Sequence, residues 1–310
     1  MAFQGKNQWA LILGGSSGFG LASAQSLAAL GLNLFVVHRD RRGVMAAIDS
    51  AFEDIRKTGV KVVSFNTNAL EAEGRNTILA AMADQLNGGK VRTLLHSIAL
   101  GNLKPIAPVA KQSDAPIINL AAKLGLSAEK VKESINTLFN EGDISFADLA
   151  ETPKYDDSVL INEEDMAQTI YYMGTNLLTW VQQIHQRKMF ADDSRVFGLT
   201  SEGNTVAWRG YAAVSAAKAA LEAVSRSIAR EYAPFGVRCN ILQPGVTETK
   251  ALNLIPGSAH LKASALKRNP FGRLTTPEDV GGLVALLSRP EAGWINGALI
   301  RVDGGEHISG

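Results

Sequence analysis

Short runs of apolar residues alternate with helix-patterned segments along the first hundred residues of the chain. The apolar runs have the length of buried strands, which we expect at 9–13, 33–37, 60–65 and 92–98. The segments between them carry apolar residues at helical spacing and predict helices at 21–30, 45–59 and 77–86. Strands that alternate with helices at this rhythm indicate βαβ units and therefore a parallel sheet.

The same rhythm returns after about residue 166 and completes the predicted sheet. We expect further strands at 194–200, 237–245 and 297–305, and further helices at 166–188, 211–233 and 277–288. Right-handed crossovers between parallel strands place helices on both faces of such a sheet. We therefore predict an α/β fold in which one doubly wound parallel sheet of seven strands forms a single domain over 1–310.

Residues 101–165 interrupt the rhythm. KPIAPVAKQSDAPI (104–117) is rich in proline, and SAEKVKESINTLF (127–139) is patterned as a helix that the turn NEGD closes. A structureless loop of this length is uncommon in a compact domain, so we predict a partly helical insertion after the fourth strand. Insertions at the carboxyl end of a strand often cover a binding site, and we expect this one to roof the site. A surface decoration or an oligomer contact is the alternative.

Composition narrows the classes of function. The formal net charge of +1 offers no electrostatic basis for binding nucleic acid or an anionic membrane surface. The single cysteine, Cys239, excludes an intramolecular disulfide, and no Cys/His spacing predicts a metal site. No apolar run approaches the roughly 20 residues that span a bilayer. We expect a cytoplasmic protein without a membrane span.

A glycine-rich turn, LILGGSSGFGLA, follows the first predicted strand and opens the first helix. The spacing G-x-x-x-G-x-G lets the backbone turn tightly and approach a pyrophosphate. The helix that follows presents unpaired N–H groups and its positive dipole end to the anion. In this strand–turn–helix context the turn predicts dinucleotide binding. The residues expected at the cofactor are Gly14, Ser16, Ser17, Gly18, Phe19 and Gly20.

The second predicted strand ends in VVHRDRR, and this ending bears on the choice between NADH and NADPH. An acidic residue at this point would bind the ribose 2′-hydroxyl of NAD, but His38 stands there. Arg39 follows it, and arginine can pair with a 2′-phosphate that a carboxylate would repel. We therefore predict NADPH in preference to NADH, with Arg39 at the phosphate. Asp40 keeps the alternative open.

These motifs together resemble the short-chain dehydrogenase/reductase family, which has a Rossmann fold. The glycine turn matches the family's T-G-x-x-x-G-x-G, with Leu13 in place of the threonine. QPGVTET (243–249) looks like the family's loop at the nicotinamide carboxamide, and NPFGRLTTPEDV…WINGALIRVDGG (269–305) looks like its C-terminal signature. The resemblance covers about 1–100 and 166–310, and it implies a homotetramer.

Within that family, two motifs are similar to those of enoyl-acyl-carrier-protein reductases. LLHSIA (94–99) stands where other members carry N-N-A-G, and Tyr211 precedes Lys218 by seven residues instead of four. Val214 occupies the place of the ketoreductase tyrosine. Ser201 departs from this pattern, since many enoyl reductases have a second tyrosine there. It keeps the separation from Lys218 that the catalytic serine has in ordinary members.

The resemblance also implies cofactor contacts at the ends of the predicted strands and on the helix of the lysine. These residues are Asn68, Ser97, Ile98, Ala99, Lys218, Pro244, Gly245, Val246, Thr247 and Thr249.

The spacing of Tyr211 and Lys218 has a chemical rationale. Seven residues on a helix turn through about 700° and rise about 10.5 Å, so both side chains share a face and reach different parts of one bound cofactor. We expect Lys218 at the nicotinamide ribose and Tyr211 at the substrate's carbonyl oxygen. When hydride reaches the β carbon of an enoyl thioester, negative charge develops on that remote oxygen, which a displaced tyrosine is suited to stabilise.

We therefore predict NADPH-dependent reduction of a trans-2-enoyl thioester on acyl carrier protein or CoA, with Tyr211, Lys218 and Ser201 as catalytic residues. A carbonyl reductase or alcohol dehydrogenase that uses the same three residues is the alternative enzyme. A regulatory protein that senses NADPH without turnover is the alternative from another class.

The segment 250–269 mixes apolar residues with lysine and arginine. We expect a lid with an apolar inner face for the acyl chain. Its basic residues Lys262, Lys267 and Arg268 are candidates for contact with an acidic carrier protein or a CoA phosphate. An ordinary solvated helix is the alternative.

Overall fold

Seven parallel strands form one sheet in the part of the chain that the computed structural model describes, residues 2–108, 114–151, 153 and 158–309. The strand order β3-β2-β1-β4-β5-β6-β7 reverses direction between β1 and β4, as in a doubly wound sheet. The strands are β1 (Gln8–Leu13), β2 (Asn33–His38), β3 (Val62–Asn66), β4 (Lys90–His96), β5 (Phe190–Leu199), β6 (Val237–Pro244) and β7 (Leu299–Val302). The predicted fold class is confirmed.

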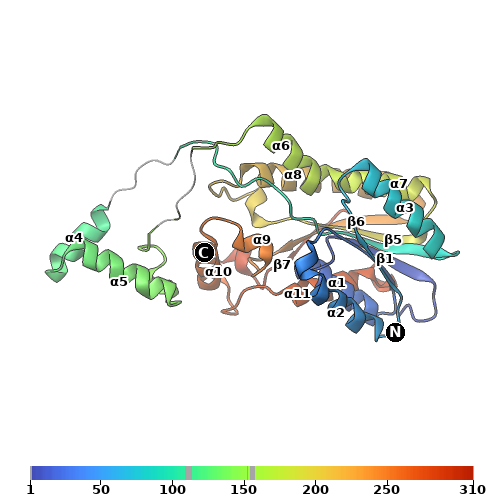
Figure 1. The fold of residues 1–310 in the computed structure, drawn as a ribbon, viewed down its shortest axis with the longest axis horizontal. Helices are drawn as coiled ribbons and strands as arrows, with labels where there is room; N and C mark the ends of the chain where they lie inside the picture. The colour runs from blue at the N-terminus through green and yellow to red at the C-terminus, as the bar shows by residue number, and fades with distance from the viewer. Residues whose placement is uncertain (1, 109–113, 152, 154–157, 310) are drawn as a thin grey trace.

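Side chains that alternate along the strands build two separate hydrophobic cores, one on each face of the sheet. In β1, Trp9 and Leu11 join the core beneath α3 (Ala72–Leu86), α7 (Asn176–Gln186) and α8 (Ala212–Glu231). Ala10 and Ile12 face the opposite core, covered by α1 (Gly18–Ala29), α2 (Met45–Arg56) and α11 (Pro277–Ser288). Burial on both faces explains why the strands read as continuous apolar runs. Figure 1 shows the sheet between these two helix layers.

The remaining helical elements are shorter or interrupted. The predicted helix at 166–188 begins as α6 (Glu163–Ile170), which a capping box at Asn162 and Asp165 starts, and it passes through a π-helical turn, η3 (Tyr171–Thr175), into α7. The others are α9 (Lys250–Asn253), α10 (Ser258–Arg268), and the 3-10 turns η1 (Arg42–Val44), η4 (Glu202–Asn204), η5 (Ala233–Phe235), η6 (Pro290–Ala292) and η7 (Glu306–Ile308).

The largest boundary error among the strands concerns β5, which starts at Phe190 although the sequence predicted residue 194. Asp192 and Asp193 made its first residues look like a loop. The carboxylate of Asp193 is instead an acceptor for Arg92 on β4, for Arg195 two residues along β5, and for Arg238 on β6, whose Nη1 lies 2.8 Å away. Arg92 and Arg238 are remote from Asp193 in sequence, so no local pattern could reveal these two partners.

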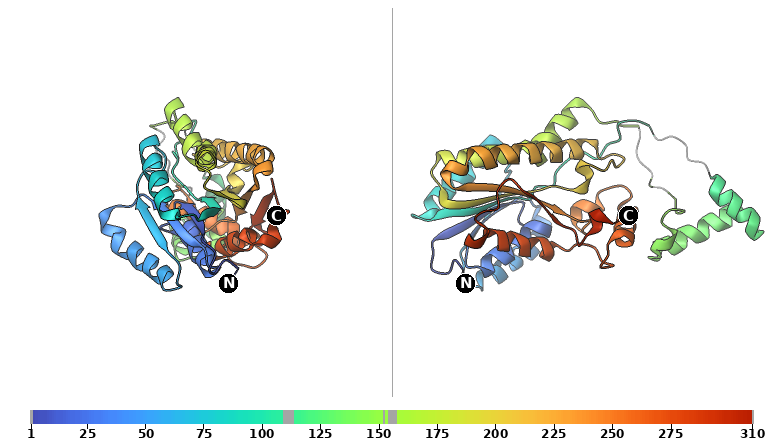
Figure 2. Two further views of the ribbon diagram at one scale, coloured as in Figure 1. Left: turned by 90° about the vertical axis from the view of Figure 1, so that its right-hand side faces the viewer. Right: turned by 180° about the vertical axis from the view of Figure 1, so that it is seen from behind.

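The insertion forms a helical hairpin that extends from the body of the molecule (Figure 2). Helices α4 (Ala115–Leu124) and α5 (Ala128–Asn140), with η2 (Ile144–Phe146), enclose a small apolar cluster of their own. The Ser127 side chain caps α5, as its sequence position suggests. The hairpin touches α10, where the rings of Phe139 and His260 lie 4.6 Å apart.

No described helix is both long and apolar enough to cross a membrane.

Candidate active site

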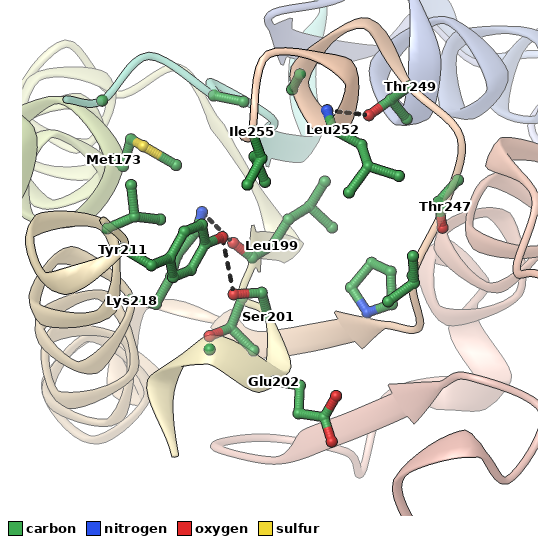
Figure 3. A pocket seen from close by; sticks show the side chains of 18 of the residues that line it. Met173, Leu199, Ser201, Glu202, Tyr211, Lys218, Thr247, Thr249, Leu252 and Ile255 are labelled. Carbon is green, nitrogen blue, oxygen red and sulfur yellow. Dashed lines mark hydrogen bonds between the residues drawn. The ribbon is translucent and has the colours of Figure 1, made fainter. Parts of the chain in front are cut away.

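A cavity of about 280 Å³ opens at the carboxyl ends of β4, β5 and β6, where the doubly wound topology predicts a ligand site. Its walls are mostly apolar and come from seven segments (Figure 3). They are Phe19 on α1, residues within 97–103 after β4, Met173 in η3, 199–203 after β5, Trp208, Tyr211, Val214 and Lys218 before and on α8, residues within 244–249 after β6, and residues within 251–261 in the predicted lid. The cavity thus gathers twelve of the predicted site residues. Of the insertion, only Gly101 and Leu103 are among the described lining residues, and α4 and α5 are not.

Tyr211, Ser201 and Lys218 converge on one side of this cavity. The hydroxyl groups of Ser201 and Tyr211 lie 3.4 Å apart, and the Lys218 ammonium donates a hydrogen bond of 2.7 Å to the Leu199 carbonyl. Figure 3 shows the two side chains entering the cavity from the same side. Tyr211 is the residue before the helix, which begins at Ala212, one residue later than predicted. Both side chains still face the same cavity.

The Tyr211 ring packs against Gly203, whose lack of a side chain leaves space for it. A Cβ on Gly203 would lie 2.4 Å from a ring carbon of Tyr211, well inside contact distance. Gly203 belongs to η4, which begins directly after Ser201. The turn that carries the serine therefore also forms one wall against the tyrosine. A side chain at this position would displace the phenol.

Burial sets the protonation states of the two groups. It raises the pKa of Tyr211 above the usual phenol range, although the hydrogen bond from Ser201 opposes the rise. It lowers the pKa of Lys218 to about 8, against the opposing attraction of Glu222. At neutral pH the site therefore holds a neutral tyrosine hydroxyl, which can donate a hydrogen bond, beside an ammonium that is close to its titration range.

His96 and Asn176 lie buried behind the lysine. Burial, and to a smaller extent the nearby charge of Lys218, lower the pKa of His96 to about 3, so the imidazole is neutral. A neutral, buried imidazole is not placed to act as a proton donor. Asn176 is fully buried directly after η3. A π-helical turn carries one extra residue, so helical counting from the sequence could not place this asparagine.

The glycine turn fits a pyrophosphate. Gly14 has a φ of +86°, and a Cβ on Gly20 would lie 2.0 Å from the Gly14 carbonyl oxygen, so side chains at these points would fill the turn. Ser17, the residue before α1, makes no side-chain cap with a described residue, which leaves the first N–H groups of the helix for an anion. Gly14, Ser16, Ser17, Gly18 and Gly20 lie at this edge of the sheet outside the lining of the cavity.

Asp40, just after β2, is held by His38 and Asn66. Its carboxylate pairs with the His38 imidazole at 3.0 Å, and Asn66 holds its backbone through two hydrogen bonds of 3.0 Å each. Arg39 is exposed, and neither its guanidinium nor those of Arg41 and Arg42 has an ion-pair partner in the described part of the chain.

Asn68, the predicted contact at the end of β3, is engaged locally. Its amide donates to Glu71 at 2.6 Å, and its oxygen accepts from the Leu70 amide.

The segment 250–269 covers the cavity with an apolar face, as predicted. Leu252, Leu254, Ile255 and Leu261 are among the lining residues. The sequence predicted that the basic residues of this segment contact a carrier protein or a CoA phosphate. In the structure they form ion pairs within the chain. Lys262 binds Glu248 at 3.1 Å, Lys267 binds Asp148 at 3.0 Å, and Arg268 binds Glu202 at 2.8 Å.

Comparison with known families decides the class of this protein. Residues 103–307 match the family model described as "Enoyl-(Acyl carrier protein) reductase", and residues 8–126 match the one described as "short chain dehydrogenase". The chain belongs to the short-chain dehydrogenase/reductase family. It is therefore an oxidoreductase of a family whose fold binds a nicotinamide cofactor.

Individual relatives are distant. A tropinone reductase homologue of Arabidopsis thaliana is 24% identical over 301 residues, which cover 97% of this chain and 93% of that protein. The structure of an enoyl-acyl-carrier-protein reductase (NADH) from Aquifex aeolicus VF5 superimposes with a TM-score of 0.70 at 22% identity, covering 100% of this chain and 99% of that one. A short-chain dehydrogenase from Burkholderia cenocepacia J2315 in complex with NADP gives the same TM-score at 20% identity, over 97% and 98% of the two chains. At these identities the structural matches establish the fold alone.

Among the residues described, no three His, Cys, Asp or Glu side chains gather closely enough to hold a metal ion.

Proposed function

We propose that this enzyme reduces the carbon–carbon double bond of a trans-2-enoyl thioester, carried by acyl carrier protein or CoA, with NADPH. The observation that carries the proposal is the position of the tyrosine. Tyr211 lies at the start of α8 with its hydroxyl in the cavity, while Val214 fills the place four residues before Lys218. A proton donor directly beside an attacked carbonyl carbon would occupy the place of Val214.

The roles of the side chains follow from their protonation states. The bound reduced nicotinamide supplies the hydride. The neutral Tyr211 hydroxyl donates a hydrogen bond to the thioester oxygen, where the enolate charge collects. Lys218, held by the Leu199 carbonyl, contributes positive charge and hydrogen-bonds the nicotinamide ribose. The apolar lid residues exclude water and contact the acyl chain.

The preference for NADPH rests on the end of β2. Asp40 is turned toward His38, so its carboxylate is not directed at the ribose, and the Arg39 guanidinium is exposed without an ion-pair partner in the described residues. A charge-assisted hydrogen bond to the 2′-phosphate contributes about 1.5–3 kcal/mol. Arg39→Ala should therefore weaken NADPH binding by roughly 10–100-fold and leave NADH binding nearly unchanged. Fluorescence titration with both cofactors measures this, and an equal loss for both would contradict the assignment.

Carbonyl reduction is the second candidate because Ser201 lies 3.4 Å from the Tyr211 hydroxyl. In that reaction the serine would share a ketone oxygen with the tyrosine, and the tropinone reductase homologue makes a ketone substrate worth testing.

Consumption of NADPH with crotonyl and decenoyl thioesters, measured beside a panel of ketones, separates the candidates. Turnover of thioesters alone supports the proposal, and turnover of ketones alone overturns it. Tight NADPH binding without any turnover would indicate a sensor.

A further inference from the structure

Four segments that are distant in sequence meet at the guanidinium of Arg268, the last residue of α10. Its two terminal nitrogens donate to both carboxylate oxygens of Glu202, at 2.8 and 3.0 Å. One of them also donates to Glu306 in the C-terminal turn η7, at 3.2 Å. The other oxygen of Glu306 accepts the Val246 amide at 3.1 Å. One side chain thus joins the lid, the turn after β5, the C-terminus and the predicted nicotinamide loop.

The charge balance at this junction depends on the arginine. Glu306 is only 2% exposed, and Glu202 and Asp303 add two more carboxylates close by. Burial raises the pKa of Glu306, while the hydrogen bonds from Arg268 lower the pKa of Glu202. His307 is the other nearby basic group, with Nδ1 3.7 Å from Glu202. Without Arg268, three acidic groups would lie together with little compensation, which is strongly unfavourable at partly buried positions.

The two partners of Arg268 each lead to the active site. Glu202 directly follows Ser201 and lines the cavity, and Figure 3 shows its carboxylate pointing away from Tyr211. Val246, held by Glu306, lines the cavity from the loop after β6. The lid residues Leu252, Ile255 and Leu261 lie in the same segment that Arg268 terminates. The position of the lid is therefore mechanically linked to both the serine turn and the nicotinamide loop.

We propose that Arg268 is a positioning residue whose fork to Glu202 and Glu306 latches the lid, 250–268, over the acyl site and keeps the Ser201 turn and the Val246 loop in register. This inference rests on the proposed function, because it assumes that the cavity beneath the lid binds an acyl thioester. Arg268 is not among the residues that line the cavity and acts through its two partners. Because the link is bidentate, lysine can replace its charge but not its geometry.

The test compares Arg268→Gln and Arg268→Lys with a matched control, Arg273→Gln. Arg273 makes a bidentate pair of the same kind with Asp279, at 2.7 and 3.0 Å, but on the exposed surface. Hydrogen–deuterium exchange of peptides covering 250–268 reports on the latch without any substrate. Kinetics with decenoyl thioester at saturating NADPH report on its effect in turnover.

We expect Arg268→Gln to speed lid exchange at least tenfold and to raise KM for the thioester about tenfold, with a smaller fall in kcat. Arg268→Lys should be intermediate, and Arg273→Gln should change each quantity by no more than about twofold. If Arg268→Gln folds poorly, the double variant Arg268→Gln/Glu306→Gln removes the most buried of the three carboxylates and should recover thermal stability while lid exchange stays fast.

Two outcomes would overturn the latch. Lid exchange in Arg268→Gln that matches Arg273→Gln shows that the arginine does not hold the lid. Fast lid exchange with an unchanged KM shows that the lid does not position the substrate. If the wild-type enzyme reduces no enoyl thioester, the exchange measurement still decides whether the latch exists, so failure of the proposed function is recognised separately.

Discussion

The two sides of the active-site cavity are held by different kinds of interaction. The catalytic side, formed by β5 and α8, positions Lys218 through a buried hydrogen bond to a backbone carbonyl and fits Tyr211 against Gly203. The lid side, formed by α9 and α10, is tied down by ion pairs, those of Lys262, Lys267 and Arg268. Buried contacts are screened little by salt, whereas partly exposed ion pairs are screened strongly. We therefore expect salt to leave the catalytic step unchanged and to alter the binding of substrate beneath the lid.

Removal of the Tyr211 hydroxyl should have the largest effect and should fall on the catalytic side alone. We expect Tyr211→Phe to lower kcat by about 10²–10³-fold, the usual cost of losing one oxyanion donor, with the melting temperature and NADPH affinity nearly unchanged. Steady-state kinetics, cofactor titration and thermal denaturation measure the three quantities. Full activity in this variant would remove the tyrosine from the mechanism.

Raising the pH should affect the catalytic side next. Burial lowers the pKa of Lys218 to about 8, so the ammonium is charged below that pH and loses its proton above it. Burial also raises the pKa of Tyr211, so the phenol stays protonated through this range. We expect kcat/KM to fall as pH rises through about 8, reaching a loss of roughly tenfold by pH 9.

Lys218→Arg provides the control for this pH profile. Arginine stays charged throughout, so whatever activity the variant retains should not decline above pH 8. The same decline in wild type and variant would assign it to another group.

Salt should have the smallest effect and should act on the lid side. At saturating NADPH and with an uncharged thioester, such as one of N-acetylcysteamine, we expect KM to rise about twofold between low salt and 0.5 M because exposed ion pairs are screened. The value of kcat should stay constant. A fall in kcat with unchanged KM would mean that salt acts on the catalytic side, and the contrast between the two sides would be wrong.

The sequence was informative wherever a structural feature repeats locally. Buried strands and amphipathic helices have fixed periods, so the seven strands could be predicted in order, although β5 begins four residues earlier than expected. The glycine turn and the separation of Tyr211 from Lys218 are local as well, and the structure brings Tyr211 and Lys218 to one cavity.

Contacts between distant segments were not accessible in this way. Asn176 is buried directly after η3, a π-helical turn that departs from regular helical counting. Glu202 and Glu306 drew no attention as isolated acids, and the pairing of Asp40 with His38 depends on how β2 ends.

The sequence by itself therefore determined the order of the elements, because spacing along a helix or strand fixes which side chains share a face. Its motifs, by their resemblance to the family, pointed to the tyrosine and the lysine of the site. Only the tertiary structure decided that Arg268 is bound to Glu202 and Glu306 and that Asp40 faces His38. The sequence around a charged residue does not indicate which residue it will pair with. This pairing depends on which segments the packed sheet and its helices bring within hydrogen-bonding distance.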